Sequence, residues 1–173
     1  MITGDRNITD NAIDLSKLDV IFTSKPLLFG GLVMEYYGLR KSRHDIDLII
    51  TNEDYQTLLI KYPGSKKDRW GDFGLEIGDF ELWRSICKLE YDFYSEGAIE
   101  YETYKVMSFE KMFFMKAIAY DNEPEVQKHT DDFKIMIQYY YDKYQNKEYV
   151  EYMNKHSDKY LSVPYGIIYN DKY

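Results

Sequence analysis

The residues with the clearest chemical potential lie in segment 29–50, which reads FGGLVMEYYGLRKSRHDIDLII. Gly30 and Gly31 follow an apolar run and open a helical pattern, so their backbone N–H groups can approach a phosphate without an intervening side chain. Asp45 and Asp47 then flank one apolar residue in a β-branched run. Because side chains alternate along a strand, the two carboxylates are expected to share a face, where they suit a divalent cation that bridges triphosphate oxygens.

Each of these two patterns can also be explained by structure alone, without a function. A Gly-Gly pair alone is usually a turn, and an acid–apolar–acid triplet alone is common on exposed strands. Their combination in the order strand, turn, helix and strand favours a site for phosphate and metal over a purely structural explanation. The glycine turn is expected to need a positive φ, and a side chain on Gly31 is expected to crowd the phosphate.

A basic cluster stands immediately before the two aspartates. Arg40, Lys41 and Arg43 are expected to bind triphosphate through charge-assisted hydrogen bonds. The alternative is that they only balance the charge of the aspartates. His44 is a lone loop histidine that either contacts a phosphate or has no part in the site.

The glycine turn followed by the acidic strand resembles the minimal nucleotidyltransferases, which are related in fold to DNA polymerase beta and to the kanamycin and lincosamide nucleotidyltransferases. Their motif is an apolar residue, Gly, then Gly or Ser, a spacer, and acid–apolar–acid. The resemblance covers residues 27–48 closely and residues 108–137 more loosely. In these families a helix with a lysine precedes a helix that opens with an acid pair, and Lys116 with Asp131 and Asp132 is similar to that arrangement. The plain alternatives are a solvated lysine and first-turn acids favoured by the helix dipole.

The resemblance also implies a third carboxylate on a neighbouring strand. The candidates are Glu81 and Glu76, each between two apolar residues. Glu81 is preferred because it follows a hairpin turn and leads into Trp83, where a long strand beside the central one is expected. Either glutamate could instead be an exposed strand residue.

The pattern of apolar periodicity and turn residues predicts an α+β fold: a small mixed β-sheet with flanking helices and a helical C-terminal part. The resemblance implies that this sheet is a nucleotidyltransferase core. The core is placed at residues 1–107, and residues 108–173 are a helical extension of the same compact unit. Strands are expected at residues 27–29, 45–51, 73–77, 80–86 and 98–106, helices at 10–18, 32–39, 54–62, 109–120, 125–144 and 149–154, and a polar loop at 66–71.

Composition narrows the class of protein. The 173 residues are about one domain in length, and no apolar run is long enough to span a bilayer. The first residues do not form a signal peptide, and the single cysteine, Cys87, suits a reducing cytoplasm as a small core residue. A net charge of −8 makes long nucleic acid an unlikely partner. The 19 tyrosines are either ordinary helix surface or a protein interface.

Together these features predict a cytoplasmic transferase that moves a nucleoside monophosphate from a triphosphate, ATP in the first instance, to an acceptor, with release of pyrophosphate. The acceptor is a small molecule, a protein or an RNA end. Mg²⁺ or Mn²⁺ is the expected cofactor, held by Asp45, Asp47 and Glu81, and the expected nucleotide-binding residues are Gly30, Gly31, Arg40, Arg43 and Lys116. One alternative is a catalytically silent binding or regulatory module, such as the antitoxin half of a toxin–antitoxin pair. Another is a structural protein whose tyrosine-rich helices contact a partner protein or a second copy.

Overall fold

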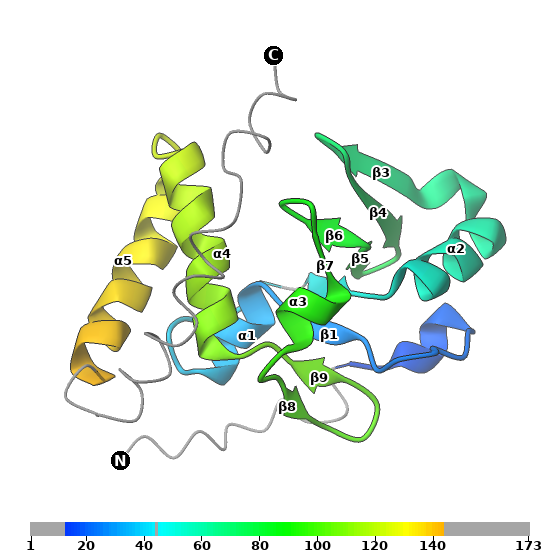
Figure 1. Ribbon diagram of the computed structural model, residues 1–173, viewed down its shortest axis with the longest axis horizontal. Coiled ribbons are helices and arrows are strands. Elements are labelled where there is room, and N and C mark those ends of the chain that lie inside the picture. Colours follow the sequence, from blue (N-terminus) through cyan, green and yellow to red (C-terminus); the bar gives the residue numbers. More distant parts are fainter. Residues whose placement is uncertain (1–12, 44, 144–173) are drawn as a thin grey trace. The chain divides into compact units, whose positions relative to one another are not determined.

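The computed structural model describes residues 13–43 and 45–143, and the chain divides into two compact units, Met1–Ser108 and Phe109–Tyr173. Figure 1 labels the helices and strands. The first unit contains a mixed β-sheet with helices, and the described part of the second is helical. The predicted mixture of helices with a mixed multi-stranded sheet is confirmed. Within the described ranges, no helix is long and apolar enough to cross a membrane.

The main sheet has seven strands in the order β3-β4-β5-β2-β1-β9-β8. At its centre, β2 pairs parallel with β5 and antiparallel with β1, and β1 pairs parallel with β9. The remaining neighbours are antiparallel. The strands are β1 (Leu27–Phe29), β2 (Ile46–Ile49), β3 (Lys66–Arg69), β4 (Asp72–Ile77), β5 (Phe80–Trp83), β8 (Ile99–Glu100) and β9 (Lys105–Val106).

Two neighbouring register rows decide where the core and the polar face lie. One row runs through Leu28, Leu48, Leu82 and Leu75, and all four side chains are fully buried. The next row runs from Phe29 through Asp47 and Glu81 to Glu76. Because adjacent residues of a strand point to opposite faces, this acidic row lies on the face opposite the four leucines. The leucines therefore fix the face on which the carboxylates stand.

The helices of the first unit begin and end at recognisable signals. Thr51 caps α2 (Asn52–Lys61): its hydroxyl oxygen accepts a hydrogen bond from Asp54 N at 3.2 Å, and Pro63 follows the helix. The Asp54 carboxylate also accepts a hydrogen bond from Thr23 N at 2.8 Å, which ties the segment before β1 to α2. The other helices are η2 (Leu15–Leu18), α1 (Gly31–Tyr36), η3 (Pro63–Ser65) and α3 (Tyr91–Ser95).

A small second sheet, β6 (Ser85–Ile86) with β7 (Leu89–Glu90), follows β5. Its turn residues, Cys87 and Lys88, both have positive φ, 55° and 61°. The carboxylate of Asp72 holds this turn by accepting hydrogen bonds from Ser85 Oγ, Cys87 N and Lys88 N at 2.7–2.8 Å. Burial of the Cys87 thiol, with Asp72 nearby, raises the pKa of Cys87 to about 12.

The polar loop predicted at residues 66–71 is wrong. The segment contains the edge strand β3, and its tight turn to β4 has positive φ at Trp70, 54°, and at Gly71, 88°. All residues of β3 are charged, so apolar alternation gives no signal there. An edge strand pairs on one side only and tolerates such residues. The prediction missed β3 because its pairing with β4, and not its own hydrophobicity, forms it.

Three further boundaries differ from the prediction. The extended segment at 98–106 is two short paired strands, β8 and β9, and the interval after β6 holds β7 and the short helix α3, which were not predicted. Of the expected helix at 10–18, the described part forms only η2, with Asp14 as its N-cap. Asp14 is the cap because its carboxylate accepts a hydrogen bond from Ser16 N at 3.1 Å. Asp10, the first residue of that expected helix, lies outside the described residues, as does the expected helix at 149–154.

The described part of the second unit consists of α4 (Phe109–Asn122) and α5 (Gln127–Lys143), side by side in Figure 1. Both helices were predicted, and Pro124 lies in the break between them. Their contact is a series of aromatic rings. The centroid of Phe113 is 5.8 Å from that of Phe133 and 5.4 Å from that of Tyr140, and Phe109 is 4.4 Å from Tyr139. Several of the tyrosines that are abundant in this chain therefore pack between α4 and α5.

Candidate functional site

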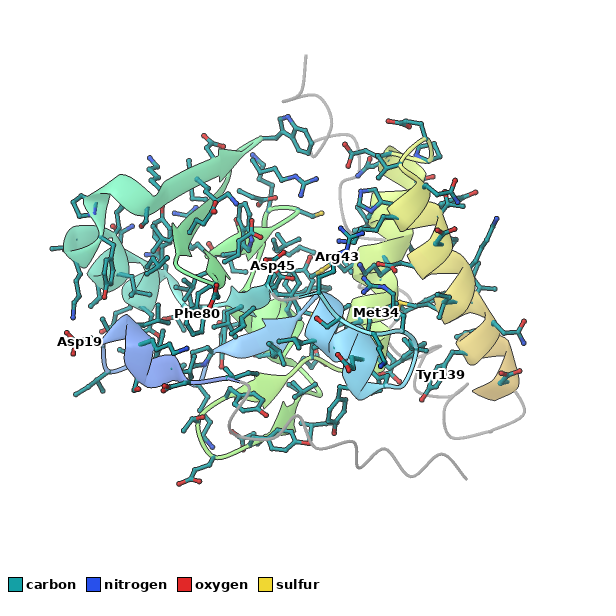
Figure 2. All side chains as sticks on the ribbon, turned by 180° about the vertical axis from the view of Figure 1, so that it is seen from behind. Asp19, Met34, Arg43, Asp45, Phe80 and Tyr139 are labelled. Carbon is teal, nitrogen blue, oxygen red and sulfur yellow. The ribbon has the colours of Figure 1, made fainter. Side chains whose placement is uncertain are left out.

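The candidate site lies where β2 and β5 run side by side. Asp47 on β2 pairs in register with Glu81 on β5, so the two side chains share a face as direct neighbours. Glu76 on β4 pairs with Glu81 and lies one strand further from Asp47. Asp45 is exposed and precedes β2 by one residue (Figure 2). The expected position of Glu81, on the strand beside the aspartates, is therefore present, and Glu76 is the more distant glutamate.

Gly30 is fitted to Asp47. Its φ of +73° and ψ of −142° form a combination that glycine adopts readily and other residues do not. A Cβ built on Gly30 would overlap Asp47 Oδ2 and lie 3.0 Å from Asp47 Cγ. The carboxylate of Asp47 thus occupies the space that the missing side chain leaves, and the glycine turn and the acidic strand form one local structure.

Gly31 differs from Gly30 in its backbone conformation. It is the first residue of α1 and does not have a positive φ, so the expectation of a positive φ holds at Gly30 and is wrong at Gly31. A Cβ on Gly31 would lie 3.1 Å from Ser42 Oγ and 3.8 Å from Arg40 Nη1. The reason is that the basic segment 40–43 folds back onto the start of α1. This fold is held in part by Ser42 N, which donates to Glu35 Oε2 at 3.0 Å.

The basic cluster therefore stands beside the glycine turn. Arg40 is half-buried and donates from Nη1 to the Lys41 carbonyl at 3.1 Å, whereas Lys41 and Arg43 are exposed. Figure 2 labels Arg43 and Asp45, which lie near the end of the sheet where β2 begins. His44, between them in sequence, lies outside the described residues. One region of the first unit thus contains Gly30, Gly31, Arg40, Asp47 and Glu81.

Glu81 has a partner that the sequence did not predict. Lys67 Nζ lies 2.7 Å from Glu81 Oε1 and 2.9 Å from Glu76 Oε2. The side chains of Glu81, Lys67 and Glu76 are 29%, 36% and 62% exposed. Burial lowers the pKa of Lys67, but the hydrogen bonds to Glu81 and Glu76 outweigh burial and raise it above its usual value. Lys67 is therefore held as a cation between the two glutamates.

The candidate ligands for a divalent cation at this site are carboxylates. Asp45 and Asp47 supply the hard oxygen ligands that Mg²⁺ and Mn²⁺ prefer. Glu81 is in place by strand register, but its Oε1 accepts a hydrogen bond from Lys67. Across residues 13–43 and 45–143, no three His, Cys, Asp or Glu side chains are grouped so that they could hold a metal ion. The ligand chemistry of the two aspartates therefore suits the cofactor, whereas Glu81 would first have to separate from Lys67.

Lys116 and the acid pair lie in the second unit. Lys116 Nζ donates to Asp132 Oδ2 at 2.6 Å, and the two side chains are 12% and 2% exposed, so Lys116 is not the solvated lysine of the plain alternative. The alternative of first-turn acids is wrong too. Helix α5 begins at Gln127, which places Asp131 and Asp132 beyond its first turn, so the expectation that this helix opens with the acid pair is wrong as well. Asp131 is exposed and accepts a hydrogen bond from Gln127 Nε2 at 2.7 Å.

Two residues of the site were missed by sequence reasoning. Lys67 was assigned to a polar loop, and only the pairing of β3 with β4 brings it to the acidic face. The hydroxyl of Ser42 lies against Gly31, but in sequence Ser42 stands between two basic residues, and only these were predicted to belong to the site. A signal for Lys67 existed in the paired Lys66-Lys67, which is typical of an edge strand.

Comparison of the chain with protein-family models, curated proteins and solved structures found no match. A function for this chain can therefore be inferred only from its own residues and contacts.

Proposed function

We propose that this chain is a metal-dependent nucleotidyltransferase, which transfers a nucleoside monophosphate from a nucleoside triphosphate to an acceptor. The observation that carries the proposal is the position of Asp47. Its carboxylate lies against Gly30 on one side and is in register with Glu81 on the other. A glycine turn for phosphate and two neighbouring carboxylates for a cation thus meet at one residue.

Each residue of the site has a role in this reaction. Asp45 and Asp47 would hold the divalent cation, which when bound neutralises and polarises the triphosphate oxygens. The backbone N–H groups at Gly30 and Gly31 and the guanidinium of Arg40 would hold the phosphates, with Arg43 at the exposed edge. Lys116 remains a proposed nucleotide ligand on the resemblance alone.

The chemical step is a displacement at the α-phosphorus. An acceptor oxygen forms a bond to this phosphorus, and the bond to the bridging oxygen between the α- and β-phosphates breaks, so that pyrophosphate leaves with the electron pair. Glu81 is suited to complete the metal site or to take the proton of the acceptor hydroxyl, because it stands beside Asp47 and is 29% exposed. If Glu81 has this role, its removal reduces transfer more than nucleotide affinity.

The ion pair between Lys67 and Glu81 favours a second candidate function. With Glu81 held by Lys67, the chain could bind nucleotide at Asp45 and Asp47 without turnover. It would then act as a binding or regulatory module, of the kind found as the antitoxin half of a toxin–antitoxin pair.

The deciding experiment uses nucleoside triphosphates labelled at the α-phosphate, incubated with the protein, Mg²⁺ or Mn²⁺, and cell lysate as the source of acceptor. Nucleotidyl transfer predicts label in an acceptor with the wild type and, at saturating triphosphate, with Glu76→Gln, and loss of label with Asp47→Asn and with Glu81→Gln. Loss with Glu76→Gln and retention with Glu81→Gln would contradict the assignment of the third carboxylate. Metal-dependent nucleotide binding with no labelled product from any triphosphate would favour the binding module.

A further inference from the structure

We infer that Lys67 is an internal competitor of the divalent cation at Glu81, so that the affinity of the site for metal–nucleotide is set by an ion pair within the chain. The inference rests on the proposed function, because it concerns the carboxylate expected to complete that site. It assigns a role to the edge hairpin β3–β4, which the nucleotidyltransferase proposal does not use.

The geometry shows how a residue on the edge strand reaches the centre of the sheet. Lys67 is on β3 and pairs with Gly74 on β4, which in turn pairs with Trp83 on β5. The Trp83 ring lies over Gly74, where a Cβ would be 2.7 Å from Trp83 Cε3. Lys67 reaches across β4 on the same face, and its ammonium lies 2.7 Å from Glu81 on β5 and 2.9 Å from Glu76 on β4.

The charges around this ammonium explain why Lys67 is retained on this face. Glu76 and Glu81 are directly opposite each other on antiparallel strands, an arrangement that is destabilising for like charges. Lys67 contacts both carboxylates and relieves their repulsion. A cation that binds Glu81 offers the same relief and is repelled by the ammonium, so the two compete for one carboxylate.

Glu76 is the second half of the device. Because Lys67 divides its contacts between Glu76 and Glu81, removal of the Glu76 charge leaves Lys67 to Glu81 alone. Loss of Glu76 is therefore expected to strengthen the Lys67–Glu81 pair and weaken metal–nucleotide binding, although Glu76 itself is one strand further from Asp47. Loss of Lys67 is expected to have the opposite effect.

Lys66 supplies the matched control. It is adjacent in sequence and carries the same charge, but its ammonium lies 4.9 Å from the centre of the Phe73 ring. Because neighbouring strand residues point to opposite faces, Lys66 stands on the face away from Glu81. A Lys66→Met change therefore alters the net charge equally without touching the ion pair.

The test measures the affinity for ATP in the presence of Mn²⁺ by titration calorimetry, on the full chain. Lys67→Met is expected to tighten binding about fivefold, the effect of losing one partly exposed ion pair. Lys67→Arg and Lys66→Met should leave the affinity near that of the wild type, and Glu76→Gln should weaken it. In a Glu81→Gln background, Lys67→Met should have no effect, because the carboxylate for which the two cations compete is gone.

The outcomes separate the inference from the function on which it rests. A wild-type chain that binds no ATP with Mn²⁺ overturns the proposed function and the inference with it. Wild-type binding with an affinity that Lys67→Met leaves unchanged overturns the inference alone. Equal gains from Lys66→Met and Lys67→Met also overturn it, because the effect would then be one of net charge. Circular dichroism of each variant confirms that the compared proteins are folded.

Discussion

Gly30→Ala is expected to destabilise the chain far more than an ordinary glycine substitution. Two separate terms act at this position. The backbone has φ +73° and ψ −142°, which an alanine adopts only with strain, and the added Cβ overlaps the carboxylate of Asp47. The substitution therefore tests directly whether the glycine turn and the acidic strand form one structure.

The magnitude follows from these two terms. Holding a non-glycine residue in a sparsely populated backbone region costs about 1–3 kcal/mol. Displacing Asp47 from its preferred rotamer adds about 0.5–1.5 kcal/mol. The expected loss in the free energy of unfolding is therefore about 2–4 kcal/mol.

Gly38 is the control for a positive φ without crowding, because its φ is +72° and no heavy atom lies within 4 Å of its would-be Cβ. Gly38→Ala is expected to cost about 1–2 kcal/mol. In an Asp47→Ala background the excess cost of Gly30→Ala should shrink without vanishing, since Asp47 Cβ lies 3.1 Å from the added atom. Urea unfolding followed by circular dichroism measures all these differences. A Gly30→Ala variant no less stable than Gly38→Ala would refute the contact between Gly30 and Asp47.

Two further predictions concern parts of the chain away from this turn. The Cys87 thiol should react with iodoacetamide at pH 8.5 at least tenfold more slowly in the folded protein than in urea. Its pKa is raised to about 12 in the folded protein, whereas an unperturbed thiol, with a pKa of about 8.5, is half ionised at that pH. Equal rates would contradict the burial of this thiol. Asp132→Asn should lower the free energy of unfolding by about 3–5 kcal/mol, because it leaves the nearly buried Lys116 without its carboxylate. The exposed Asp131→Asn is its control, with a change of about 0.5 kcal/mol or less, and equal effects in a urea titration would contradict the pairing.

The parts of the fold that could be predicted are those with a local signal. The short apolar run before Gly30 and the β-branched run after Asp45 predict β1 and β2, and the turn residues between 77 and 80 predict the β4–β5 hairpin. The resemblance implied a third carboxylate on the strand beside the aspartates, the hairpin signal favoured Glu81, and Glu81 pairs with Asp47. These elements bury apolar side chains at regular spacing, and such spacing is visible in the sequence.

What could not be predicted depends on partners distant in sequence. β3 has only charged residues and is a strand because β4 accepts it at the edge of the sheet. The role of Lys67 follows from that pairing, which has no periodic signal. The assignment of positive φ to Gly30 and not to Gly31 likewise depends on Asp47, which lies seventeen positions along the chain from Gly30.

The most direct test of the central claim is the metal dependence of nucleotide binding by the wild type and by Asp47→Asn. Titration calorimetry with ATP, in Mg²⁺ and again in excess EDTA, measures it without an acceptor. ATP is expected to bind the wild type at least tenfold more tightly in Mg²⁺ than in EDTA. A folded Asp47→Asn variant should lose most of that difference, because Asp47 carries the charge that holds the cation beside the glycine turn. Equal affinity of the wild type for ATP with Mg²⁺ and with EDTA would contradict the central claim.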